Sequence, residues 1–261
     1  MKKIGLLLII FSANCVPVLG WGQKGHDVIA YIAEKHLTGR TKRAVSEILE
    51  GRSIVYYSSW MDNLRNSPRW DGGYDVTKTW HYANVDEGHT YESMRKEQAG
   101  DVLTALDRII SGLKSGELCD SLKSDYLKML VHLIGDMHCP MHAGRLTDRG
   151  GNEVRVMWFG TPTDLHSVWD TEMIESARKW SYTEWQRQLD RYGRKQIKAV
   201  TSGIVREWFD ETVAAAEFIY ENTSAGDDLR YRYIYDFNDL LERQLLYAGY
   251  RLAAVLNGIF G

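Results

Sequence analysis

The chain has 261 residues, a formal net charge of −3 at pH 7, 44% hydrophobic residues and 26% charged residues. This composition is typical of a folded globular protein and excludes a disordered or fibrous one. The near-neutral charge also argues against a basic surface that holds nucleic acid by counterion release, although metal ions in a site could still attract a polyanion.

The first 20 residues predict a secretory signal peptide. A basic start precedes the apolar run at residues 4–11, which is too short to span a bilayer. Cleavage after residue 20 would make Trp21 the first residue of a single mature domain, 21–261. We expect this domain to be periplasmic or secreted, monomeric, and not stably inserted in a membrane. The alternatives are a buried N-terminal helix or acylation at Cys15.

Helical periodicity dominates the rest of the chain. Only residues 152–159, which follow two glycines, alternate as a strand does, and segments 66–80 and 84–92 are typical of loops. The pattern predicts a mostly α, single-domain, multi-helix fold with a small β-hairpin. The predicted helices are 27–37, 43–49, 101–113, 125–137, 163–177, 204–220 and 240–259.

Two His-x-x-x-Asp pairs stand in apolar segments rich in Trp and Met: His132 with Asp136, and His166 with Asp170. On a helix this spacing places both side chains on one face, about 6 Å apart. Imidazole and carboxylate are ligands that zinc accepts in open catalytic sites. Burying both pairs without a metal would be costly, so they predict a metal site. The alternatives are hydrogen-bonded structural histidines and ordinary surface pairs.

Further candidate ligands surround these pairs in the sequence. His142 follows Pro140, where the preceding helix must end, His81 lies in a loop after a Trp, and Asp62 ends the run Ser-Trp-Met-Asp.

The expected mature N-terminus is a candidate ligand as well. A free α-amino group has a pKa near 8, so it is partly deprotonated and able to bind a metal at neutral pH. With its own carbonyl oxygen, the Trp21 amine could form a chelate, and His26 lies one helical turn away. Such a site would exist only after cleavage. The alternative is an ordinary helix start.

In this order, the residues resemble the zinc-dependent single-strand-specific nucleases, the S1/P1 nuclease family, whose architecture the zinc phospholipases C share. The resemblance runs from Trp21 to Asp170, and it implies the mostly α fold of both groups. It rests on Trp21-Gly22 with His26, Ser59-Trp60-Met61-Asp62, Trp80-His81-Tyr82, His132 to Met137, Pro140-Met141-His142, Gly150-Gly151-Asn152, and His166 to Asp170.

The resemblance implies three Zn²⁺ ions per chain, with Asp136 touching two of them. The first ion would be held by Asp62, His81, His132 and Asp136. The second would be held by His142, His166 and Asp170, and paired with the first across a bridging water. The third would be held by the Trp21 amine and carbonyl, His26 and Asp136.

The resemblance also implies substrate contacts. Arg65 would bind phosphate or aid the transition state, acting with the catalytic carboxylates Asp62 and Asp136. Tyr82 would stack on a base, and the Asn152 amide would contact a phosphate oxygen. Asn84 stands where some members carry an Asp that pairs with a purine edge, so base preference could differ. Each of these residues has an alternative role. Arg65 could be an ordinary surface residue, Tyr82 could pack in the core, and Asn152 could be a turn residue before a strand.

Cys119 and Cys139 remain in the mature chain, and export permits a disulfide between them without requiring one. Cys139 lies between two candidate zinc ligands. We favour a bystander role for it, because the implied ligand set is complete without it.

The resemblance implies a secreted zinc-dependent phosphodiesterase that cleaves single-stranded RNA and DNA endonucleolytically to 5′-phosphate products and hydrolyses 3′-nucleotides. One alternative is a zinc phospholipase C, although those enzymes usually carry Glu at the Asp170 ligand position. Another is a non-enzymatic zinc-binding secreted protein, which would need neither an open coordination position nor Arg65.

Overall fold

The computed structural model describes residues 21–66 and 77–261, except the side chains of Arg65 and Asn66. The predicted signal segment and most of the predicted loop 66–80 lie outside these residues. The predicted mostly α class is confirmed. The longer helices are α1 (Gln23–His36), α2 (Gly39–Ile48), α4 (Val102–Ser115), α5 (Asp120–Met137), α8 (Tyr182–Leu189), α9 (Arg194–Val200), α10 (Val205–Glu221) and α11 (Tyr231–Phe260).

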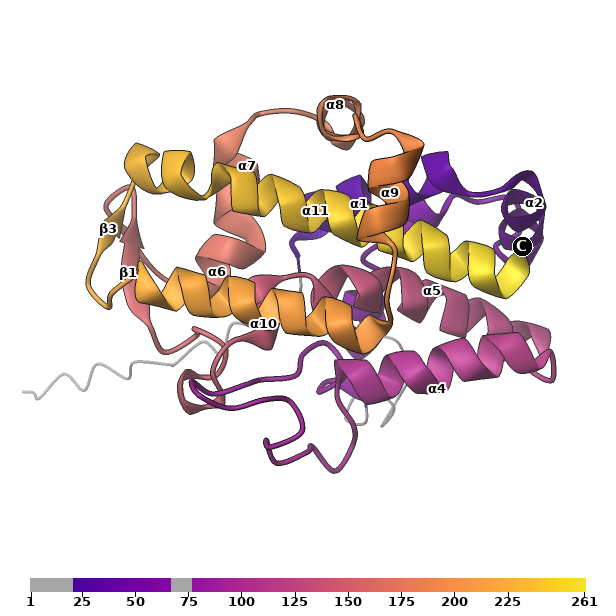
Figure 1. Ribbon diagram of the computed structural model, residues 1–261, viewed down its shortest axis with the longest axis horizontal. Helices are drawn as coiled ribbons and strands as arrows, with labels where there is room; N and C mark the ends of the chain where they lie inside the picture. The colour runs from indigo at the N-terminus through magenta and orange to yellow at the C-terminus, as the bar shows by residue number, and fades with distance from the viewer. Residues whose placement is uncertain (1–20, 67–76) are drawn as a thin grey trace, which may run out of the picture.

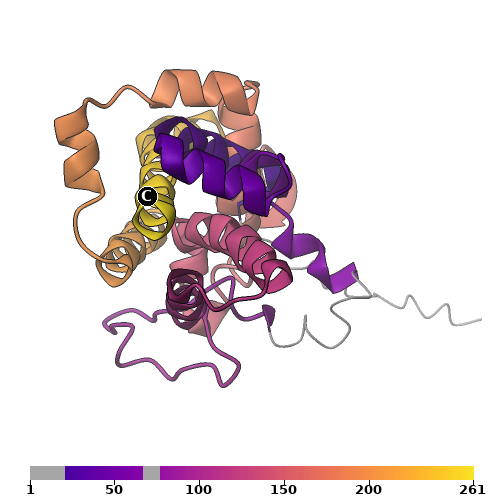
Figure 2. The ribbon, with the colours of Figure 1, turned by 90° about the vertical axis from the view of Figure 1, so that its right-hand side faces the viewer.

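Helix α11 runs along the molecule, with α10 beside it and the hairpin of α4 and α5 below (Figure 1). Helix α1 packs along α11 and also contacts α5 and α8. Viewed from the end, α1, α5 and α11 enclose the middle of the bundle (Figure 2). None of the helices within the described ranges has the length and apolar character needed to cross a membrane.

Capping residues in the sequence account for both ends of α4. The Asp101 side chain accepts the Thr104 N–H at the start of α4, and Gly116 ends this helix in the left-handed region at φ 73°. Helix α5 begins at Asp120, five residues before the predicted start. Three of the four residues in its first turn are polar, and Leu122 alone makes no apolar stripe that would predict it.

The prediction of one helix over 163–177 is wrong at its start. Thr161–Asp164 forms strand β2, because Thr161 and Thr163 are β-branched and pair with Trp158 and Val156. The Asp164 side chain then accepts the Ser167 N–H and caps α6 (Leu165–Ser167). A π-helical turn, η6 (Val168–Glu172), and α7 (Met173–Ala177) follow.

The predicted hairpin is present and belongs to a three-stranded sheet within the described residues. Strand β1 (Arg155–Trp158) pairs antiparallel with β2 and parallel with β3 (Asp228–Leu229). Phe159 and Gly160 connect β1 to β2 with φ values of 49° and 81°, as in a tight hairpin turn. Helices α8 and α9 and the first nine residues of α11 were not predicted.

Candidate metal centre

A fully buried carboxylate on α5, Asp136, lies at the centre of a histidine cluster. Its Oδ1 is 3.2 Å from His26 Nε2 on α1. Its Oδ2 is 2.8 Å from His81 Nδ1 and 3.0 Å from His132 Nε2, one helical turn earlier on α5. The predicted His-x-x-x-Asp pair therefore does place both side chains together, and two distant segments add an imidazole each.

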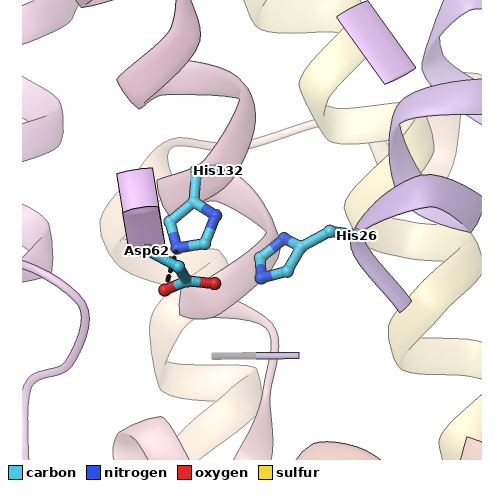
Figure 3. A group of neighbouring side chains, drawn as sticks. All are labelled: His26, Asp62 and His132. Carbon is cyan, nitrogen blue, oxygen red and sulfur yellow. Dashed lines mark ion pairs between the residues drawn. The ribbon is translucent and has the colours of Figure 1, made fainter. Parts of the chain in front are cut away.

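Asp62 reaches the same cluster from the 3₁₀ segment η2 (Met61–Asn66). Its Oδ1 lies 3.4 Å from His132 Nε2 and 3.8 Å from His81 Nδ1. Figure 3 shows His26, Asp62 and His132 turned toward one another from three segments, and the His26 and His132 rings stack at 4.1 Å. The ligand atoms of these three residues lie within 4.8 Å of one another, as do those of His81, His132 and Asp136.

A second cluster forms where α5 ends. One ligand atom each from Cys139, His142 and Asp170 lies within 4.8 Å of the others. The His166 ring stacks on that of His142, with centroids 5.2 Å apart. Asp170 belongs to the π-helical turn, a local distortion that is frequent at functional sites. The structure thus groups His142 and Asp170 of the predicted second set with Cys139, and it places His166 beside His142 through the ring contact.

Trp21 and Gly22, the first described residues, lie against this second cluster. The Gly22 N–H donates to the Asp170 carbonyl oxygen at 2.7 Å, and the Trp21 side chain is fully buried. The expected N-terminal ligand is therefore next to the turn that carries Asp170. Arg65 is in η2 three residues after Asp62, but its side chain lies outside the described residues.

Backbone carbonyls orient three of the imidazoles. A carbonyl oxygen can only accept, so each Nδ1 carries the proton and Nε2 is the nitrogen able to bind a metal. Metal-binding histidines commonly donate their second N–H in this way. These carbonyls have no side-chain signature, and the sequence analysis missed them. The bonds run from His132 to Ser58 at 2.9 Å, from His142 to His81 at 2.7 Å, and from His166 to Gly150 at 2.8 Å.

Two glycines permit close approaches at the clusters. A Cβ at Gly135 on α5 would lie 2.8 Å from His26 Nδ1, so a larger residue would displace this imidazole. Gly150 has φ +65°, and a Cβ there would lie 2.5 Å from the Met141 carbonyl oxygen. Gly150 can therefore adopt the turn whose carbonyl accepts from His166.

The protein's own charged groups favour the ionised form of Asp136 but not that of Asp170. Burial opposes ionisation of Asp136, but attraction to His132 and His142 lowers its pKa well below the usual value. Burial, followed by repulsion from Asp136 and Asp62, raises the pKa of Asp170 well above the usual value. The second cluster therefore lacks positive charge around its carboxylate.

The pKa values of the clustered histidines also shift in different directions. Burial lowers the pKa of His142 to about 4 and also lowers that of His26, so both imidazoles are neutral near pH 7 and able to bind a metal. The pKa of His132 is raised well above 6.5, because attraction to Asp136 and Asp62 outweighs its burial. A bound cation would compete with this proton.

A cation fits the unsatisfied atoms of the two clusters. The Oδ1 atoms of Asp136 and Asp170 are buried and accept no hydrogen bond from the described residues. Leaving buried carboxylate oxygens without a partner is costly. Imidazole nitrogen, carboxylate oxygen and thiolate sulfur are the donors that zinc takes in proteins.

A cavity of about 180 Å³ adjoins the second cluster, and Tyr82, Asn84 and His166 are among the residues that line it. Asn84 Nδ2 donates to the Gly144 carbonyl oxygen at 2.9 Å, which leaves Oδ1 as an acceptor.

Asn152 does not line this cavity with Tyr82 and Asn84. Its Nδ2 donates to the Arg149 carbonyl oxygen at 2.7 Å, within its own turn.

The two cysteines do not form a disulfide. Cys119 is exposed just before α5, whereas Cys139 is buried just after it, and both are free thiols.

Comparison with known proteins identifies the family. Residues 21–261 match the sequence model of the family described as S1/P1 Nuclease. The chain is 29% identical to Endonuclease 2 of Arabidopsis thaliana, over 100% of this chain and 98% of that protein. It is 32% identical to Nuclease S1 of Aspergillus oryzae over 60% of this chain and 56% of that protein, and 25% identical to Nuclease P1 of Penicillium citrinum over 92% and 98%. The chain therefore belongs to the S1/P1 nuclease family.

Proposed function

We propose that the protein is a zinc-dependent phosphodiesterase that cleaves single-stranded RNA and DNA endonucleolytically, leaves 5′-phosphates, and removes the phosphate of 3′-nucleotides. Family membership makes it a hydrolase of phosphodiester bonds. The observation that carries the proposal is the contact of one buried carboxylate, Asp136, with three imidazoles from separate segments, at 2.8–3.2 Å.

Three zinc ions per chain account for this arrangement. The two oxygens of Asp136 lie nearest different imidazoles, Oδ2 near His81 and His132 and Oδ1 near His26, so Asp136 suits a carboxylate shared by two ions. Asp62 completes the first set, and the Trp21 amine and carbonyl complete the set of His26. The remaining ion is assigned to His142, His166 and Asp170. When bound, zinc supplies hydroxide near neutral pH by lowering the pKa of a bound water to about 7, and it offsets phosphate charge.

The protein side chains bind and orient the substrate in this proposal. Tyr82 offers a ring on which any base can stack, a contact that tolerates sequence variation. Asn84 offers its Oδ1 to a base edge. Arg65 pairs with a phosphate oxygen, as the family resemblance implies. The Asn152 amide donates one N–H to the Arg149 carbonyl oxygen, so its second N–H is the donor for a phosphate oxygen.

The protein is exported in this proposal, and removal of residues 1–20 creates the Trp21 ligand. The burial of Trp21 and the bond from Gly22 to Asp170 support a mature end fixed beside the metal ligands. Maturation would then produce both the exported chain and the complete centre.

One assay tests the proposed activity. The mature chain, 21–261, is incubated with single-stranded RNA, 3′-AMP and phosphatidylcholine, each with and without a chelator. We expect cleavage of the RNA and release of phosphate from 3′-AMP, both abolished by the chelator. Hydrolysis of the lipid alone would instead indicate a phospholipase C. Zinc binding without hydrolysis of any substrate would indicate a non-enzymatic zinc-binding protein.

A further inference from the structure

We propose that the Cys139 thiolate is a protein ligand of the second metal ion, beside His142 and Asp170. This inference rests on the metal centre proposed above. It reverses our expectation from sequence that Cys139 is a bystander. The ligand atoms of Cys139, His142 and Asp170 lie within 4.8 Å of one another, which is the spacing that a single shared ion requires.

The backbone fixes where this thiol lies. The Cys139 N–H donates to the Asp136 carbonyl oxygen and the Cys139 carbonyl accepts the His142 N–H, both at 2.9 Å. Pro140 then begins η4 (Pro140–Ala143), the 3₁₀ turn that carries His142. The residue is thus held at the junction between the end of α5 and this turn. The side chain is completely buried and forms no disulfide.

A second observation points to a cation at this position. The Asp170 side chain is 6% exposed, and its Oδ1 accepts no hydrogen bond from the described residues. In this cluster the Asp170 carboxylate lies within 4.8 Å of the Cys139 sulfur and of a His142 ring nitrogen. A buried carboxylate grouped with a thiol and an imidazole has the composition of a zinc site.

Ligation by Cys139 would give the second metal ion a sulfur ligand, which the first ion lacks. Binding would exchange the S–H proton, released to solvent, for a sulfur–metal bond, and the thiolate and Asp170 together would balance the two charges of Zn²⁺. With His142 and His166, the ion would have four protein ligands, and a water shared with the first ion would be a fifth.

Cobalt substitution tests this assignment, because cobalt–thiolate bonds absorb strongly in the near ultraviolet. The mature chain is loaded with Co²⁺, and bound cobalt and absorbance are measured for the wild type, Cys139→Ser, Cys139→Ala and the control Cys119→Ser. We expect the charge-transfer band in the wild type and in the control. Both Cys139 variants should lack the band and retain about one cobalt fewer after dialysis against a weak chelator.

A measurement on the unmodified chain covers the case in which the variants fail to fold. X-ray absorption of the zinc-loaded protein should contain a sulfur shell at about 2.3 Å besides the nitrogen and oxygen shell at about 2.0–2.1 Å. Bound metal with no sulfur shell and no charge-transfer band would overturn the thiolate ligand and leave the proposed nuclease intact. A band that persists in Cys139→Ala would also overturn it. Failure to bind metal would overturn both proposals.

Discussion

At the scale of single residues, Asp136 organises the centre. It is fully buried, and each of its oxygens lies close to an imidazole nitrogen. The His-x-x-x-Asp spacing predicted the contact with His132, because it is set by the helix. The contacts with His26 and His81 join residues that are 110 and 55 positions away in the sequence. No local pattern could predict those contacts.

The first prediction concerns the shared carboxylate. Asp136→Ala should lose more than one zinc per chain and reduce nuclease activity by at least about 100-fold, because both sets of ligands lose an oxygen. Elemental analysis of purified protein measures the metal. Asp120→Ala, an exposed carboxylate in the first turn of the same helix, is the control and should keep all its zinc. A full metal content in Asp136→Ala would contradict the shared role.

The second prediction concerns the base. One Asn84 N–H is already bonded to the Gly144 carbonyl, so Oδ1 is the acceptor available to a base amino group. We expect kcat/KM to be several-fold higher for 3′-CMP, which carries such a group, than for 3′-UMP, as one hydrogen bond of about 1 kcal/mol implies. Asn84→Ala should remove the difference. Equal rates for the two nucleotides in the wild type would show that Asn84 does not read the base.

At the scale of elements, the centre depends on how closely α1 approaches α5. His26 on α1 lies against Gly135, the residue before Asp136 on α5. The sequence predicted both helices, but it did not predict that they meet at this glycine. The same limit applies to residues 161–164, where strand pairing with β1 overrides the helical pattern predicted from residue 163.

The third prediction tests this approach. Gly135→Ala should displace His26, because the new Cβ would lie 2.8 Å from Nδ1, and should reduce both zinc content and activity. Gly258→Ala on α11 is the matched control, since a Cβ there meets nothing within 4 Å. The control should keep its zinc and gain about 0.5–1 kcal/mol in unfolding free energy. Normal zinc content in Gly135→Ala would show that His26 is not constrained there.

The fourth prediction concerns Asp190, which joins three helices at the end of α8. Its carboxylate accepts from His36 at 2.9 Å and from Tyr250 and Gln186 at 2.8 Å. Asp190→Ala should reduce the free energy of unfolding at pH 7 by about 1–3 kcal/mol, because the buried Tyr250 hydroxyl and the half-buried His36 and Gln186 donors lose their acceptor. The exposed pair of Asp236 with Arg232 supplies the control, as Asp236→Ala should cost less than about 1 kcal/mol.

The pH dependence of the Asp190 effect has a definite sign. Burial alone would raise the Asp190 pKa, but hydrogen bonds from His36, Tyr250 and Gln186 lower it below 3.8. Its contribution to stability is therefore present above the unfolded pKa and is lost as the pH falls through the lower, folded value. Urea denaturation should give a difference between wild type and Asp190→Ala that shrinks only below about pH 4. A difference that grew as the pH fell below about 4 would contradict this sign.

At the scale of the whole molecule, the two ends of the metal-binding region are brought together. Gly22 bonds to the turn that carries Asp170, about 150 positions later in the sequence. Helices α1, α5 and α11 pack against one another and bury the segments that carry most of the ligands. The centre therefore depends on the completed tertiary fold, and in the proposed function it also depends on where the mature chain begins.

The fifth prediction tests the N-terminal ligand. An alanine added before Trp21 should displace the α-amine, remove about one zinc per chain, and lower activity at least about 10-fold. An alanine added after Gly261, which is exposed, should change neither quantity. Full activity and full zinc content in the N-terminally extended chain would show that the amine binds no metal.

The sequence by itself determined the mostly α class, the positions of the long amphipathic helices and the candidate ligands, because helical periodicity and i,i+4 spacing are local properties. The tertiary structure decided which ligands share a cluster, which nitrogen of each histidine faces it, and that Cys139 lies beside His142 and Asp170. These features depend on approaches between distant segments and on backbone carbonyls, which every residue possesses and no motif distinguishes.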